Sequence, residues 1–164
     1  KQDVSLNKKE LHGNMIILRT LSKIGLAGLR VGVLTASKEI IGELNKIRLP
    51  YNINTLSQAA ALVTLKHAST LNKQISLLIS ERRKLYNALL RTPGVTPFPT
   101  GTNFILMWIE KDATKVFQAL KKRGILVKNL DRPGPLKGCL RVTIGTPREN
   151  REFLTELKEA ISKS

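Results

Sequence analysis

Residues 18–32 read LRTLSKIGLAGLRVG, and this stretch decides how the rest of the chain is interpreted. It places a hydroxyl and an amine, Ser22 and Lys23, before a turn of small residues, and a guanidinium, Arg30, after it. Short apolar runs flank the turn, and runs of this length predict β-strands. The two predicted strands are residues 15–18 and residues 31–34.

These three polar side chains suit an aldehyde that carries a phosphate. A lysine amine can condense with a carbonyl group to form a Schiff base. A hydroxyl and a planar guanidinium can both bind a phosphate, and glycines let a ligand approach the backbone closely. Taken alone, the pattern is explained more simply by a surface lysine beside a tight turn in a lysine-rich chain.

The rest of the chain alternates helical and extended patterns. Apolar residues at helical spacing predict a helix after Ser37, a second from Thr55 and a long amphipathic one through residues 71–89. The clearest boundary signal in the sequence is Thr92-Pro93-Gly94. Beyond it we expect strands at residues 95–98, 104–109, 125–127 and 140–144, and helices around residues 116–120 and from Thr146 onward.

These patterns predict a mixed α/β chain in three parts. We expect residues 1–65 to form part of an α/β layer, residues 66–92 a connecting helix and residues 93–164 a small α+β domain. Trp108 lies in the strongest strand pattern, so we expect it in the core. Cys139 is the single cysteine, which excludes a disulfide framework and indicates a small buried residue.

The chain is strongly basic, with 28 Lys and Arg against 12 Asp and Glu and a formal charge of +16. Such a charge suits nucleic acid, an anionic membrane surface or small anions. The densest basic clusters, residues 82–84 and 121–123, lie in predicted helices without aromatic residues between them. The basic clusters are explained better as solvated helix faces than as platforms for stacking bases. A nucleic-acid-binding domain remains an alternative hypothesis. No apolar run reaches the length of a membrane span, and we expect a cytoplasmic protein.

Four motifs, in order and at matching spacing, resemble the histidinol-phosphate aminotransferases, which are class I and II aminotransferases of fold type I. They are residues 18–32, residues 48–54 (RLPYNIN), residues 103–106 (NFIL) and residues 138–146 (GCLRVTIGT). The resemblance implies that residues 1–65 are the C-terminal part of the large, cofactor-binding domain. It further implies that a long helix joins this part to the small domain.

The resemblance also implies roles for individual residues. Lys23 would carry pyridoxal 5'-phosphate covalently and then act as the general base at the substrate α-carbon. Ser22 and Arg30 would bind the cofactor phosphate. Arg141 would clamp the anionic group of each substrate, and Lys128 stands where many relatives carry an arginine near the substrate. No metal site is expected.

The complete enzyme implied by the resemblance is a homodimer of histidine biosynthesis. It would convert histidinol phosphate and 2-oxoglutarate into imidazole acetol phosphate and glutamate. The chain begins with Lys1, and no residue matches the family's Asp that pairs with the pyridine nitrogen. We therefore expect a C-terminal fragment that is inactive alone. Another fold type I enzyme, an amino-acid aminotransferase or a threonine-phosphate decarboxylase, is the main alternative because the cofactor motif is shared.

Overall fold

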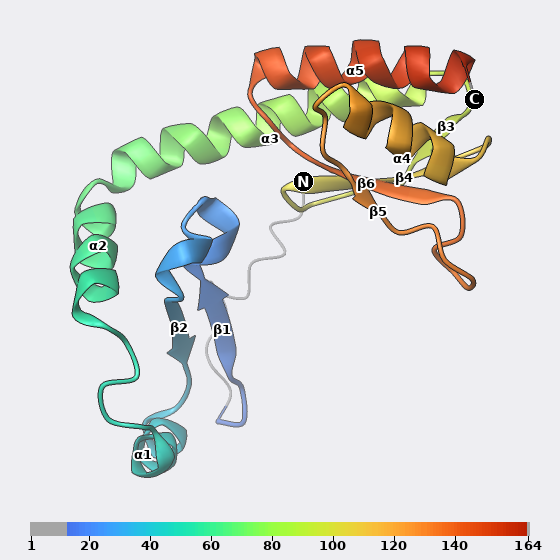
Figure 1. Cartoon of the computed structure of the whole chain (residues 1–164). Helices are drawn as coiled ribbons and strands as arrows, with labels where there is room; N and C mark the ends of the chain where they lie inside the picture. Colours follow the sequence, from blue (N-terminus) through green and yellow to red (C-terminus); the bar gives the residue numbers. More distant parts are fainter. Residues whose placement is uncertain (1–12, 164) are drawn as a thin grey trace. The chain divides into compact units, whose positions relative to one another are not determined.

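The computed structural model describes residues 13–163 (Figure 1), and the chain divides into two compact units between Leu71 and Asn72. The first 12 residues of the predicted segment 1–65 lie outside the described residues. Within residues 13–163, none of the helices combines the length and the apolar character that crossing a membrane requires.

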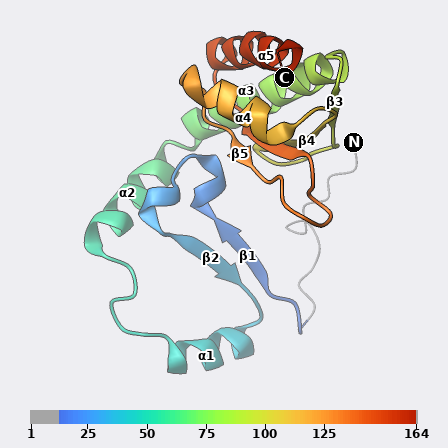
Figure 2. The same cartoon turned by 45° about the vertical axis from the view of Figure 1, so that its right-hand side comes forward.

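The first unit is built on two antiparallel strands, β1 (Ile17–Thr20) and β2 (Gly32–Thr35). Figure 2 shows them side by side, joined by a turn of two short 3-10 helices, η2 (Leu21–Ile24) and η3 (Ala27–Leu29). Both strands lie slightly further along the chain than predicted. Gly32 permits the pairing, because a Cβ atom there would lie 3.0 Å from the carbonyl oxygen of Arg19.

Two helices follow in the first unit, α1 (Lys38–Ile47) and α2 (Thr55–Lys66). The helix predicted after Ser37 is confirmed, and the Ser37 side chain caps it by accepting a hydrogen bond from the backbone N–H of Ile40. Asn54 caps α2 in the same way. Helix α2 begins at Thr55 as predicted.

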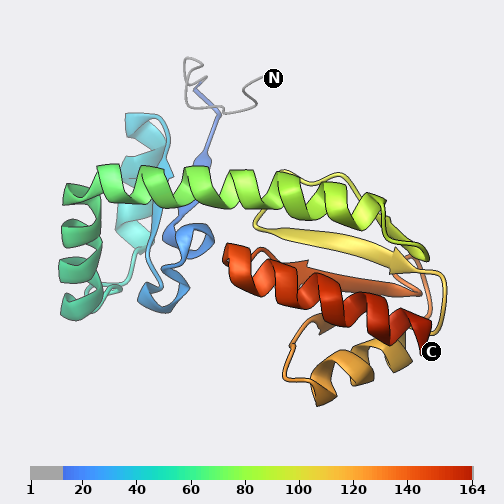
Figure 3. The same cartoon turned by 90° about the horizontal axis from the view of Figure 1, so that it is seen from above.

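The second unit is a four-stranded antiparallel sheet with helices on one face (Figures 1 and 3). The strand order is β3-β4-β6-β5. The strands are β3 (Val95–Pro97), β4 (Phe104–Ile109), β5 (Lys128–Asn129) and β6 (Cys139–Thr143). The helices are α3 (Ala68–Leu90), α4 (Ala113–Lys122) and α5 (Pro147–Ser162), and α3 occupies most of the predicted connecting segment 66–92.

Strand β4 shows how the alternation of side chains sets the core. Ile105, Met107 and Ile109 are buried, and they belong to the same core cluster as residues of α3, α4 and α5. The intervening residues Phe104 and Leu106 are only half-buried. Within the described part of this unit, the three helices cover one face of the sheet, and these intervening side chains lie on the other face.

The prediction for Trp108 is wrong, because this residue shares the less covered face and is 39% exposed. Gly138 makes room for the indole ring. It adopts the left-handed conformation with φ of 74°, and a Cβ atom there would lie 2.7 Å from Trp108 Nε1. Cys139 is buried as predicted, and burial raises the pKa of its thiol.

The prediction of a strand at residues 125–127 is also wrong. The N–H of Ile125 donates to the carbonyl oxygen of Leu120, which ties this segment to the end of α4. Gly124 makes the turn with φ of 79°. Pairing with β6 therefore begins only at Lys128, which lies directly opposite Arg141.

Helix α5 begins as the sequence predicts. The Thr146 side chain accepts from the N–H of Glu149, and the Glu149 carboxylate accepts from the N–H of Thr146. This reciprocal capping box, followed by Pro147 in the first turn, fixes the point at which the chain leaves β6 and enters the helix.

Candidate active site

The turn between β1 and β2 holds three of the predicted site residues. Ser22 and Lys23 lie in η2, and Arg30 is the C-terminal cap of η3. The N–H of Leu21 donates to the carbonyl oxygen of Val31 at 3.3 Å. This bond ties together the chain neighbours of Ser22 and Arg30, so one short turn presents both residues.

Thr20 orients Ser22, and sequence reasoning missed this residue. The Thr20 hydroxyl accepts from the N–H of Ser22 at 3.1 Å and donates to Ser22 Oγ at 2.9 Å. Ser22 Oγ thus accepts one hydrogen bond and keeps its own hydrogen available for a ligand. The hydroxyl of Thr20 at the N-cap of η2 was the available signal, because such side chains cap helix starts.

Arg30 holds an unusual backbone conformation. Its φ of 56° and ψ of 31° lie in the left-handed region, and its N–H donates to the carbonyl oxygen of Ala27. For a residue with a Cβ atom this conformation costs about 1–2 kcal/mol. This conformation ends η3 at Arg30 and turns the chain toward β2.

The turn carries two positive charges, on Lys23 and Arg30. Lys23 and Arg30 are both exposed, and within residues 13–163 no carboxylate lies in ion-pair distance of either one. An amine, a hydroxyl with a free hydrogen and an unpaired guanidinium are the donor set that a phosphorylated aldehyde requires. The residues of this turn therefore fit pyridoxal 5'-phosphate.

The other two predicted site residues lie side by side in the second unit. Lys128 on β5 is directly opposite Arg141 on β6, with Lys128 exposed and Arg141 half-buried. Within the described part of the chain no carboxylate pairs with either side chain. Two adjacent cations without a counterion form a site that attracts an anion.

The Arg141 side chain packs against an aromatic ring. Its guanidinium carbon lies 4.9 Å from the centre of the Phe104 ring, a cation–π distance. Its Nε atom is buried and lacks a hydrogen-bond partner among the described residues. A buried donor left unpaired costs about 1–3 kcal/mol, so the native chain tolerates a penalty at this residue.

The loop between β5 and β6 is fixed by a carboxylate. Asp131 accepts from the N–H of Gly138 at 2.8 Å and from the hydroxyl of Thr114 at 2.9 Å. The first of these bonds is the main reason why the pKa of Asp131 is lowered. Because this loop connects the strands that carry Lys128 and Arg141, it sets the register that places the two cations opposite one another.

The far end of β6 is anchored by Asn150. Its side-chain oxygen accepts from the N–H of Gly145 at 3.0 Å, and its NH2 group donates to the Gly145 carbonyl oxygen and to buried Glu81. Lys84 lies 2.8 Å from Glu81, and this contact is the main cause of the lowered pKa of Glu81. The network joins α3, the end of β6 and α5.

The described residues contain no cluster of three or more His, Cys, Asp or Glu side chains suited to a metal ion.

The five predicted site residues form two groups, one in each unit. Ser22, Lys23 and Arg30 lie in the turn, and Lys128 and Arg141 lie on the sheet.

Comparison with known proteins identifies the family. The family described as Aminotransferase class I and II matches residues 3–157. The chain belongs to this aminotransferase family. The resemblance seen in the sequence motifs is thereby confirmed, as is the expected fold class.

Curated histidinol-phosphate aminotransferases are similar to this chain in sequence. Histidinol-phosphate aminotransferase 2 of Nitrosococcus oceani is 46% identical over 151 residues, covering 91% of this chain and 42% of the relative. That of Chromobacterium violaceum is 46% identical over 146 residues, covering 88% of this chain and 41% of the relative. The chain thus spans about two fifths of the length of these curated relatives.

Solved structures share the fold of this chain. The histidinol-phosphate aminotransferase of Sinorhizobium meliloti, in complex with pyridoxal-5'-phosphate, has a TM-score of 0.77 at 27% identity and covers 92% of this chain and 42% of that one. The L-threonine-O-3-phosphate decarboxylase of Porphyromonas gingivalis has a TM-score of 0.80 at 25% identity and covers 92% of this chain and 47% of that one.

Proposed function

We propose that this chain is the C-terminal part of a pyridoxal-phosphate-dependent aminotransferase of histidine biosynthesis. The complete enzyme exchanges an amino group between histidinol phosphate and 2-oxoglutarate, giving imidazole acetol phosphate and glutamate. One observation carries the proposal. A single turn presents Ser22, Lys23 and Arg30, with no carboxylate among residues 13–163 paired to Lys23 or Arg30, in a chain 46% identical to a histidinol-phosphate aminotransferase.

In this proposal Ser22 and Arg30 hold the cofactor phosphate, Ser22 by donating its free hydroxyl hydrogen and Arg30 by charge. The Lys23 amine would hold the cofactor covalently, and the same amine would take and return the proton at the substrate α-carbon. Pyridoxal 5'-phosphate, when bound, supplies the electron-withdrawing ring that makes this proton removable.

Arg141 and Lys128 take the anionic groups of the two substrates in turn. Histidinol phosphate offers a phosphate and 2-oxoglutarate a carboxylate, and the planar fork of Arg141 can bind either one. Lys128 adds charge from the neighbouring strand but lacks the fork, so it attracts the anion without fixing its orientation.

We propose further that the complete enzyme is a cytoplasmic homodimer. The exposed apolar side chains of the first unit favour contact with another protein surface. Ile47, Leu49 and Leu56 are 78%, 74% and 82% exposed. Light scattering of the complete protein tests the dimer, and a mass of one chain at micromolar concentration contradicts it.

The main alternative is a fold type I enzyme with other chemistry, and the similarity to L-threonine-O-3-phosphate decarboxylase favours it most directly. A substrate with an amine and a phosphate would use the same turn and the same pair of cations. The two functions differ in their products. A decarboxylase releases carbon dioxide, whereas an aminotransferase converts 2-oxoglutarate to glutamate.

The cofactor assignment can be tested on the 164-residue chain. Pyridoxal 5'-phosphate is added, the lysine–cofactor bond is trapped by borohydride reduction, and the labelled peptide is found by mass spectrometry. We expect the label on Lys23, its loss in Lys23→Ala and its retention in Lys66→Ala, which removes another exposed lysine of the first unit. Equal labelling of all exposed lysines, or undiminished total labelling in Lys23→Ala, would overturn the assignment.

The substrate assignment needs the complete protein and a substrate panel. We expect kcat/KM for histidinol phosphate to exceed that for threonine phosphate and for aromatic amino acids at least tenfold, with glutamate as co-product. Release of carbon dioxide from threonine phosphate at the higher rate would establish the alternative.

A further inference from the structure

We propose that Phe104 is a positioning residue for Arg141. Its ring fixes the guanidinium so that the two Nη groups, and not Nε, bind the substrate anion. The inference rests on the proposed function for its substrate and on the geometry of the second unit for everything else.

The register of the sheet brings the two residues together. Arg141 lies opposite Leu106 on β4, and Phe104 lies opposite Thr143, so Phe104 and Arg141 are diagonal neighbours on the same face. Diagonal pairs are within reach of aromatic and long side chains. The distance of 4.9 Å between the guanidinium carbon and the ring centre shows that the contact is made.

The buried Nε atom determines which edge of the Arg141 guanidinium can bind an anion. Among the described residues, Arg141 Nε is sealed from solvent without a partner, and its Nη groups are not sealed in this way. A carboxylate or phosphate approaching through Nε would have to displace the side chains that cover it. The anion therefore meets the Nη edge end-on.

An aromatic ring is better suited than a carboxylate to hold the Arg141 guanidinium in place. A carboxylate beside Arg141 would hold it equally well but would neutralise the charge that the substrate needs. The face of Phe104 attracts the cation and leaves that charge available. It also opposes repulsion from Lys128, which lies directly across the strand pair and would push Arg141 away.

The test uses substitutions that separate the ring face from apolar volume. Phe104→Leu keeps an apolar side chain without the π face, and Phe104→Tyr keeps the face. Phe98→Leu is the matched control, because Phe98 is another partly exposed phenylalanine of the same unit and follows β3. A general effect of losing a phenylalanine would appear in both leucine variants.

The first measurement needs no activity. In an NMR spectrum of the 164-residue chain, we expect the Arg141 Nε–H signal upfield of other arginine signals because of the ring current, and slow to exchange. Its absence in Arg141→Lys assigns it. The shift should vanish in Phe104→Leu and persist in Phe104→Tyr and Phe98→Leu. A signal at the ordinary position in the unsubstituted chain would overturn the inference.

The second measurement is kinetic and uses the complete protein. We expect Phe104→Leu to raise KM for histidinol phosphate about fivefold to tenfold, with kcat changed less than about twofold, and Phe104→Tyr to restore KM. A normal KM in Phe104→Leu contradicts the inference. Failure of the unsubstituted protein to use histidinol phosphate contradicts the proposed function instead, and the NMR result then still decides the positioning role.

Discussion

At the scale of single residues, the backbone of Arg30 shapes the turn and its side chain supplies a positive charge. Its backbone adopts a conformation that glycine accepts more readily, while its guanidinium supplies the charge for a phosphate. Tyr51 has the same φ of 56° and is 97% exposed, without a place in the proposed site. Comparing Arg30 with Tyr51 therefore distinguishes the effect of the backbone conformation from the effect of the guanidinium.

We predict that Arg30→Gly lowers affinity for pyridoxal 5'-phosphate at least tenfold without lowering stability, because relief of about 1 kcal/mol of strain offsets the lost side chain. Cofactor titration and urea unfolding of the 164-residue chain measure the two effects. Tyr51→Gly is the control and should relieve the same strain with unchanged cofactor affinity. Unchanged affinity in Arg30→Gly would remove Arg30 from the site.

Gly138 gives a second prediction at this scale. Gly138→Ala should destabilise the chain by about 1–3 kcal/mol, because its φ is positive and the new methyl group would meet the Trp108 ring. Thermal unfolding measures the loss, and the fluorescence of Trp108, the single tryptophan, reports its displacement. Gly101→Ala, which places a methyl group in open space, should leave both unchanged.

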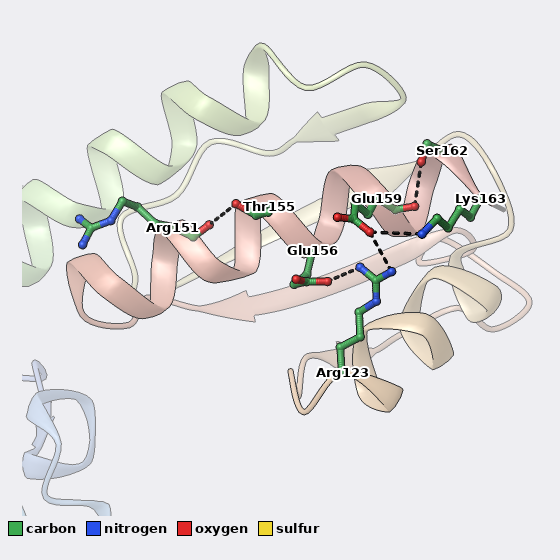
Figure 4. Close-up of polar contacts among 7 residues, drawn as sticks. All are labelled: Arg123, Arg151, Thr155, Glu156, Glu159, Ser162 and Lys163. Carbon is green, nitrogen blue, oxygen red and sulfur yellow. Dashed lines mark hydrogen bonds and ion pairs between the residues drawn. The ribbon is translucent and has the colours of Figure 1, made fainter.

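At the scale of secondary-structure elements, the end of α4 is joined to α5 by an ion-pair network (Figure 4). Arg123 at the C-terminal cap of α4 contacts Glu156 and, through Nη2 at 2.9 Å, Glu159. Lys163 lies 3.3 Å from the same Glu159 carboxylate. The contact with Arg123 is the largest cause of the lowered pKa of Glu159.

We predict that Arg123→Ala lowers the thermal midpoint by a few degrees, and less at high salt, because the network is partly exposed. A carboxylate with a lowered pKa in the folded state stabilises the fold above its ordinary pKa. That contribution is lost as the pH falls through the folded-state value.

The difference between Arg123→Ala and the native chain should therefore be full near pH 7 and should shrink below about pH 4.5, the ordinary value for glutamate. Lys115→Ala is the control, because its contact with Asp112 is long and exposed. A difference that stays constant from pH 7 to pH 3 would show that the network contributes nothing by charge.

At the scale of the whole molecule, the two units differ in how much they bury. The second unit contains a contiguous buried core contributed by α3, α4, α5 and the sheet. Among the described residues of the first unit, only Ser57 and Ala61 are buried. Stability should therefore be distributed unevenly along the chain.

We predict that hydrogen exchange separates the two units. Amides of β4, β6 and α5 should exchange orders of magnitude more slowly than those of β1, β2 and α1, because local opening of the first unit exposes little new apolar surface. Mass spectrometry of peptides from the exchanged chain makes the measurement. Equal protection of β1 and β4 would show that the first unit is stabilised by contacts other than buried apolar side chains.

The sequence by itself determined the turn with Ser22 and Lys23, the strand at residues 104–109 and the helix that begins after Thr146. Each depends on spacing within a few residues. The tertiary structure decided that Phe104 lies beside Arg141, that Lys128 pairs opposite Arg141, and that Trp108 lies outside the core. Cross-strand contacts depend on register, and loops held by groups such as Asp131 and Gly138 set that register. No local pattern contains that information.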